Sequence, residues 1–237
     1  FQTRWYMETK YGPKGERRRG RGERGLSGLI RRLQPSLTEH ERTLNSALRY
    51  MESGLNEPIS RPGYRFREPY AYRANSYTKG SLFYEMLRYV VGDSVWDRIC
   101  HTYFDRWKFK HVNEARFREV CEEVSGQDLG WFFHEWLHDS VLVDYALGDV
   151  ERRRQPDGRW VTVVTVERRE RGVMPVEVEV VTETGQRQVK RWDGKARKGQ
   201  VTFVTDARVR TVHVDPRDQI LDRNRLNNGT VRLAVYP

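Results

Sequence analysis

The chain has 237 residues, a length that suits one large domain or two small ones. Hydrophobic residues make up only 37%, but 12% of all residues are aromatic and supply enough apolar surface to favour a packed core. The 43 lysines and arginines exceed the 33 acidic residues and give a net charge of +10, which raises the question of an anionic partner. No run of residues is long and apolar enough to predict a transmembrane helix.

Much of the positive charge lies near the start of the chain, in a Gly/Arg tract at residues 13–25. Such a tract has almost nothing to bury and therefore predicts a flexible loop. The arginines from Arg17 to Arg24 would suit an anionic polymer such as RNA, or an anionic lipid surface. No aromatic RNA-binding signature or zinc-knuckle spacing accompanies them, so a solvated loop is the simpler interpretation and no specific nucleic-acid partner is expected.

Helical periodicity runs through the first part of the chain, to about residue 138. The pattern predicts one or two helices within residues 26–55 and four more further on, with Asp93, Asn113 and Asp128 as caps at three of their starts. These four are expected at residues 75–92, 93–107, 112–126 and 127–138. Cys100 and Cys121 fall on apolar faces of two of them, which leaves open buried thiols or a helix-to-helix disulfide.

After Asp139 the period of the apolar residues changes to two, and turn residues separate the runs. Strands are expected at residues 161–167, 175–181, 187–192, 201–205 and 209–215. Short alternating runs of this kind are typical of an antiparallel β-sandwich. The sequence therefore predicts an α + β chain of two domains, a helical one at residues 1–138 and a β-sandwich at residues 139–237.

A literal HExxH motif, His134-Glu135-Trp136-Leu137-His138, lies at the end of the helical part. On a helix this spacing places two histidines one turn apart, which is the arrangement that a zinc metallopeptidase uses to hold its metal and activate water. Both histidines, however, point away from the apolar stripe of the same helix, and the chain turns to strands before a third ligand can follow. We therefore interpret the motif as a coincidence and predict no metal ligand among His134, Glu135 and His138.

Short motifs follow one another in a fixed order between residues 64 and 138. They are Tyr77-Thr78-Lys79-Gly80, Leu87-Arg88, Gly92, Tyr103, Ser125-Gly126-Gln127-Asp128-Leu129 and Phe132-Phe133-His134-Glu135-Trp136-Leu137. In this order and spacing they resemble the aminopeptidase-N-like family of zinc metallopeptidases, the gluzincins. The later strands resemble, more loosely, the sandwich that follows the family's catalytic domain. The resemblance places both histidines of the HExxH at variable positions of a structural helix.

The first residues, "FQTRWYMETKYG", look like the helix that follows the family's third zinc ligand. The resemblance thus implies that the zinc ligands precede Phe1 and that the chain is the C-terminal portion of a zinc-dependent peptidase. On this reading the parent hydrolyses peptides with zinc, while the chain alone holds no metal, needs the missing N-terminal part as its partner and is inactive. The family's Gly-x-Met-Glu-Asn segment is absent, so exopeptidase activity does not follow.

Tyr77 is the residue to which the resemblance assigns a catalytic role. In the family the matching tyrosine stabilises the oxyanion of the tetrahedral intermediate, and a phenol suits this role because it can donate a short hydrogen bond where negative charge develops. The structural alternative is a tyrosine that packs at a helix N-terminus capped by Ser76 or Asn75. For Lys79 the sequence leaves open a salt bridge or a surface charge.

Other classes of function remain open from the sequence. The chain could be a non-catalytic aminopeptidase-like scaffold or interaction module, or it could bind an anionic polymer through the Arg17–Arg24 tract. The carboxylates and amides of residues 215–228 suggest a calcium loop but lack the EF-hand spacing, so a strand end with Asx turns is the simpler interpretation. Substrate, oligomeric state and compartment are not fixed by the sequence.

Overall fold

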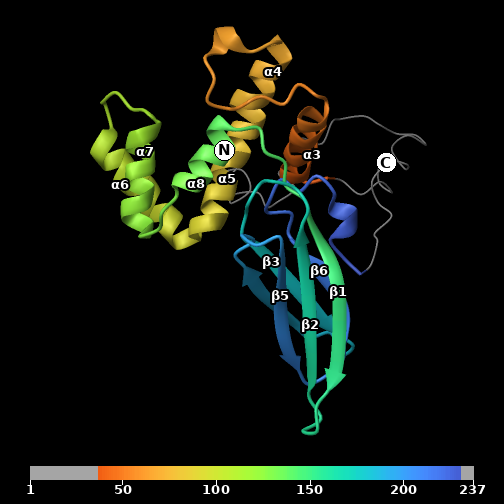
Figure 1. The fold of residues 1–237 in the computed structure, drawn as a ribbon. Coiled ribbons are helices and arrows are strands. Elements are labelled where there is room, and N and C mark those ends of the chain that lie inside the picture. Colours follow the sequence, from red (N-terminus) through yellow and green to blue (C-terminus); the bar gives the residue numbers. More distant parts are fainter. Residues whose placement is uncertain (1–36, 231–237) are drawn as a thin grey trace, which may run out of the picture.

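The computed structural model describes residues 37–230 of the chain (Figure 1). The loop expected at residues 13–25, with its Arg17–Arg24 tract, and the helix expected at Phe1 lie outside the described residues. The helical elements come first and the strands second, which confirms the α + β class. No helix among residues 37–230 is long and apolar enough to cross a membrane.

The helical part consists of α-helices joined by short 3-10 and π-helical turns. They are α3 (Glu39–Glu52), η1 (Gly63–Arg65), α4 (Pro69–Arg73), η2 (Ala74–Lys79), α5 (Gly80–Val91), α6 (Asp93–Trp107), α7 (Glu114–Ser125), α8 (Gly130–Phe133) and η3 (His134–His138). Helix α3 begins with a capping box, in which Thr38 accepts from the Glu41 amide and the Glu41 carboxylate accepts from the Thr38 amide. Only this one helix of the region 26–55 falls within the described residues.

Two of the three predicted caps need correction. Asn113 caps α7 as expected, since its side-chain oxygen accepts from the Arg116 amide at 3.0 Å. Asp93 is already the first residue of α6, because Gly92 stands before it with a φ of +88°, a conformation that ends α5 and that glycine adopts easily. Asp128 precedes the helix start by two residues and accepts from the amide of Gly130 instead.

The segment around Tyr77 also differs from the expectation. Helix α4, the π-helical turn η2 and helix α5 follow one another without a break from residue 69 to 91, so Tyr77 lies inside a helical segment. The alternative of a tyrosine at a helix start capped by Ser76 or Asn75 is therefore wrong. Neither side chain caps a helix, and Asn75 is fully buried.

The strands form two three-stranded antiparallel sheets, with the orders β1-β2-β5 and β4-β3-β6. Their bounds are β1 (Tyr145–Arg154), β2 (Trp160–Arg168), β3 (Val176–Thr182), β4 (Arg187–Trp192), β5 (Lys198–Thr205) and β6 (Val209–Val214). Alternate valines of both sheets are buried and belong to one hydrophobic cluster. The same cluster continues into the helices, so the core shows no break where the helices give way to strands.

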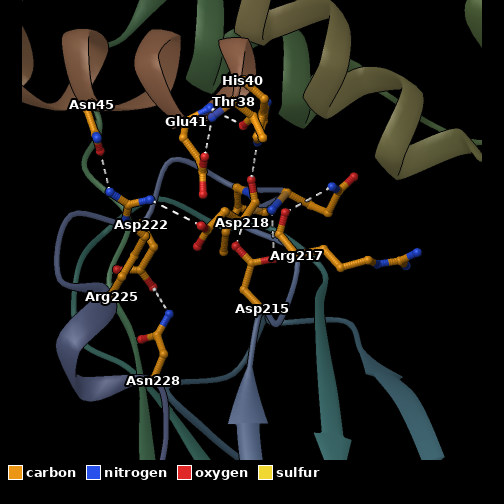
Figure 2. A network of polar contacts seen from close by, with 12 residues as sticks. Thr38, His40, Glu41, Asn45, Asp215, Arg217, Asp218, Asp222, Arg225 and Asn228 are labelled. Atoms are coloured by element: carbon orange, nitrogen blue, oxygen red, sulfur yellow. Dashed lines mark hydrogen bonds and ion pairs between the residues drawn. The ribbon is translucent and has the colours of Figure 1, made fainter. Parts of the chain in front are cut away.

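Polar side chains of α3 meet the segment after β6 where the helices adjoin the sheets (Figure 2). The Nε2 atom of His40 lies 2.6 Å from the carbonyl oxygen of Asp218, and its Nδ1 atom lies 2.9 Å from the Glu85 carboxylate of α5. Arg225 joins the same place by bonds to the Asp218 carboxylate and to Asn45. Three elements are thus tied together at this junction.

Backbone amides donate hydrogen bonds to the carboxylates after β6 that had suggested a calcium loop. Asp215 accepts from the amides of Gln219 and Ile220 at 2.8 and 3.2 Å, and Asp222 accepts from the amide of Asn224 at 2.8 Å. Burial raises the pKa of Asp215 to about 7 and that of Asp222 to about 6. The bond of Asp222 to the amide two residues on is that of an Asx turn, whereas Asp215 accepts from amides four and five residues on.

Both cysteines are free thiols, on the neighbouring helices α6 and α7. Cys121 is fully buried, and burial raises the pKa of its thiol to about 12. A thiol in such surroundings is unreactive and contributes to packing. Of the two alternatives left open by the sequence, the structure therefore contains free thiols, of which Cys121 is buried and Cys100 is partly buried.

Candidate functional site

Tyr77 projects from the π-helical turn η2, and 66% of its surface is exposed. Its ring stands edge to face against the ring of Tyr72, with centroids 6.4 Å apart and an interplanar angle of 88°. A π-helical turn holds one more residue than an α-helical turn, and such turns occur frequently at functional sites. The phenol is therefore placed in the open at a point where the helix is locally widened.

Lys79, at the end of the same turn, points the opposite way and is buried. Its ammonium nitrogen donates to Asn56 Oδ1 at 2.9 Å and to the backbone oxygen of Glu57 at 2.8 Å, and it lies 5.8 Å from the ring centre of Tyr50. Burial lowers the pKa of Lys79 to about 8, although the Glu57 carboxylate opposes that shift. Lys79 is thus neither of the two alternatives considered, because it fastens the turn to the segment after α3.

Asn75 provides the second attachment beneath Tyr77. Its amide nitrogen donates to the Tyr50 hydroxyl at 2.7 Å and to the Ala71 carbonyl at 3.0 Å. The Tyr50 hydroxyl in turn donates to the carbonyl of Leu55 at 2.5 Å. Tyr50 and Asn75 are both fully buried, so this chain of bonds fixes the turn from the inside.

The sequence analysis did not predict this inner attachment, although the sequence holds a signal for two of its residues. Ala71, Asn75 and Lys79 recur at intervals of four, the spacing of one helix face, and that face continues into the buried stripe of α5. Polar residues at core-facing positions indicate an internal hydrogen-bond network. Their partners Tyr50, Leu55, Asn56 and Glu57 lie more than 15 residues away, and nothing in the local pattern points to them.

The HExxH residues lie in the second π-helical turn, η3, and do not converge on one point. His134 and His138 are exposed, and their rings are stacked with centroids 6.3 Å apart. His138 Nε2 lies 2.8 Å from the carboxylate of Glu114 on α7. Glu135 is half-buried and accepts from the backbone amide of Val173 at 2.8 Å, and burial raises its pKa.

A catalytic zinc requires three protein ligands around one open position. Within residues 37–230, no group of three or more His, Cys, Asp and Glu side chains is arranged to hold a metal ion. The carboxylate of Glu135 points to the strand segment at Val173 and not to a space between the histidines. The described residues therefore do not fit a catalytic zinc, and the interpretation of the HExxH as a coincidence stays a prediction.

Comparisons with known proteins bear on the helical part. Residues 40–136 match the family model of the peptidase family M1 domain, whereas no curated protein matches the chain. Among solved structures, the crystal structure of Legionella pneumophila aminopeptidase A in complex with aspartic acid is similar at 15% identity and a TM-score of 0.45. That match covers 73% of this chain and 22% of the other, so the chain spans about a fifth of that protein. Residues 40–136 are thus similar to a segment of a peptidase family M1 domain, and this match supports the resemblance to the aminopeptidase-like gluzincins.

Proposed function

We propose that the chain is the C-terminal portion of a zinc-dependent, aminopeptidase-like metallopeptidase that hydrolyses peptide bonds. In this proposal Tyr77 donates the hydrogen bond that stabilises the transition state. The observation that carries it is the contrast within η2, where Tyr77 is 66% exposed while Asn75 and Lys79 of the same turn are buried and bonded. The match of residues 40–136 to the M1 domain supplies the reaction class.

The chemistry of the step explains why a fixed phenol would matter. When water attacks a peptide carbonyl, the carbonyl oxygen gains negative charge, and a donor already aimed at that oxygen lowers the barrier without reorganising. The bonds of Lys79 and Asn75 hold the backbone of the turn, so the Cα of Tyr77 has a fixed position before the substrate arrives. Loss of one such donor costs on the order of 10²–10³ in rate.

Zinc enters the proposal only through the parent protein. In the resembled family zinc activates the attacking water, and the residues described here do not fit that ion. We propose that ligands elsewhere in the same protein hold it and that this chain alone neither binds catalytic zinc nor hydrolyses peptides. We further propose that His134, Glu135 and His138 are not metal ligands, and that the domains divide at residues 1–138 and 139–237.

The test is steady-state hydrolysis of short peptides by the natural-length protein and its Tyr77→Phe variant. We expect kcat to fall by on the order of 10²–10³ with little change in KM, because phenylalanine keeps the ring and removes only the donor. His138→Ala is the matched control from the other π-helical turn and should keep both constants. An unchanged kcat in Tyr77→Phe would refute the assigned role, and one tight zinc per chain that is lost in His134→Ala would refute the reading of the HExxH.

A further inference from the structure

Exposed aromatic side chains gather beside Tyr77. Tyr64, Tyr70, Tyr72 and Tyr77 expose 84, 55, 43 and 66% of their surfaces, within 14 residues of sequence. Single exposed aromatics are ordinary, whereas a contiguous group marks an interaction site. We call these four tyrosines, together with the half-buried Phe66, the aromatic ledge. It spans η1, α4 and η2, at the end of the helical part that lies away from the sheets (Figure 1).

Three rings of the ledge, those of Phe66, Tyr72 and Tyr77, form a packed row, whereas the ring of Tyr70 stands edge to face against the buried ring of Tyr50. Phe66 stands edge to face against Tyr72 at 5.7 Å, and Tyr72 stands edge to face against Tyr77 at 6.4 Å. The turn at Gly63 packs on the Tyr72 ring, since a methyl group at Gly63 would lie only 3.4 Å from it. Ring contacts of this kind make the row a preformed surface, which lowers the entropy cost of binding.

The ledge is also basic. Residues 58–80 contain five lysines and arginines and one acidic residue, Glu68. Arg65, Arg67 and Arg73 are exposed, and none of them forms an ion pair with another described residue. The guanidinium group of Arg65 lies 5.7 Å from the ring centre of Tyr64.

The Glu57 carboxylate does not neutralise these arginines. Glu57 is only 3% exposed, and its side chain accepts from the guanidinium group of Arg61 and from the backbone amide of Arg67. The ammonium group of Lys79 is directed inward and adds nothing to the surface. Positive charge on the ledge therefore comes from guanidinium groups that stand in water and can take up carboxylates from a ligand.

We propose that the aromatic ledge is a specificity surface that binds peptide substrates rich in aspartate and glutamate and leads them to Tyr77. This inference rests on the proposed function, because it takes the reacting peptide bond to lie at Tyr77. In an extended peptide, side chains two residues apart lie on the same side at about 6.6 Å, close to the 5.7 and 6.4 Å steps between the rings. Alternate side chains of the peptide would thus meet successive rings, and acidic side chains would reach Arg65 and Arg73.

The test measures binding without catalysis, by fluorescence anisotropy of labelled ten-residue peptides added to the chain. A peptide of alternating Glu and Ala should bind at least tenfold more tightly than one of Ser and Ala, and a Lys and Ala peptide should not bind. The difference should shrink between 50 and 300 mM salt, because exposed charge pairs are screened. Equal affinity for the acidic and the neutral peptide would overturn the proposal.

Variants locate the surface. Arg65→Gln with Arg73→Gln should weaken binding of the acidic peptide by about tenfold, the effect of two exposed charge pairs. The matched control is Arg153→Gln with Arg154→Gln, which removes the same charge from exposed positions at the end of β1, far from the ledge (Figure 1). Equal losses from both double variants would mean a non-specific charge effect and would overturn the proposal. A single-stranded oligonucleotide of equal charge that displaces the peptide at lower concentration would do the same.

Tyr77→Phe separates this inference from the proposed function. The variant keeps the ring of the ledge and should bind the acidic peptide as the original chain does, while turnover by the natural-length protein falls. Acidic-peptide binding together with unchanged turnover would leave the ledge standing and refute the catalytic role. Lost turnover without any preference for acidic peptides would refute the ledge alone.

Discussion

The π-helical turns η2 and η3 each contain two polar residues four positions apart. In η2 these residues face the core, and in η3 they face the solvent. In η2 the residues four apart, Asn75 and Lys79, are buried, and Tyr77 between them is exposed. In η3 the residues four apart, His134 and His138, are exposed, and Trp136 between them is 2% exposed. The same interval therefore serves the core in one turn and the surface in the other.

The difference shows that the hydrogen-bond partners of polar atoms are stronger evidence for a catalytic or metal site than a match to a sequence motif. Each polar group of η3 that could serve a metal site has another contact, His138 with Glu114 and Glu135 with the Val173 amide, or stands in solvent. In η2 the side chains of Lys79 and Asn75 are bonded inside the protein, and the side chain of Tyr77 faces the solvent. A catalytic group needs such a fixed backbone and an accessible tip.

The largest expected effect in this comparison comes from removing the inner attachment of η2. Lys79→Ala leaves Asn56 Oδ1 and the Glu57 carbonyl without their donor and opens a space beside Tyr50. We expect the free energy of unfolding to fall by about 2–4 kcal/mol at pH 7, measured by urea denaturation. Lys195→Ala, an exposed lysine between β4 and β5, is the control and should change it by less than about 0.5 kcal/mol. A loss in Lys79→Ala no larger than in the control would mean that η2 is not fastened by this residue.

A second effect is the pH dependence that Lys79 gives to stability. Its pKa falls from 10.5 to about 8 on folding, so between these values the unfolded chain binds more protons than the folded one. Stability from this residue is therefore flat below about pH 8 and rises above it, with a slope of up to about 1.4 kcal/mol per pH unit. The measurement is the difference in unfolding free energy between the original chain and Lys79→Met, at several pH values from 7 to 10. A difference that stays constant or falls over this range would show that the ammonium group is not desolvated.

Periodicity predicted those elements whose packing is decided by neighbours on the same helix or strand. The helix expected at residues 75–92 has apolar residues at helical spacing, and all of them are buried in α5: Leu82, Phe83, Met86, Leu87, Val90 and Val91. Strand β1 was missed because its pairing with β2 shifts register between Leu147 and Val150 and its second half, Glu151 to Arg154, is entirely charged. Such a strand forms because it pairs with the backbone of β2, and the sequence of β1 contains no sign of this pairing.

For the candidate site, the sequence singled out Tyr77 through a resemblance and said nothing of how it is held. The attachment of η2 joins Asn75 and Lys79 to residues 50–57, and contacts of that separation depend on the path of the loop between them. The outward direction of His134 and His138 was predicted correctly, because it follows from the angle of 100° per residue along a stripe of aromatic residues. The bond from Glu135 to the Val173 amide was beyond the sequence, since it crosses from the helices to the segment before β3.

The smallest expected effect concerns Glu135, the residue that would be the general base if η3 were a metal site. Burial raises its pKa, so the folded state disfavours its charge, and the stability that the group contributes is complete below its unfolded pKa and lost as pH rises through the folded one. Glu135→Gln keeps an acceptor for the Val173 amide and carries no charge. We expect the variant to match the original chain at pH 4 and to be more stable at pH 8, by less than about 1 kcal/mol, in urea denaturation at both values.

Glu135→Ala, which leaves the amide without an acceptor, is the control and should lose stability at both pH values. A glutamine variant that is less stable at pH 8 than at pH 4, relative to the original chain, would show that the carboxylate is needed in its charged form, as a metal site would need it.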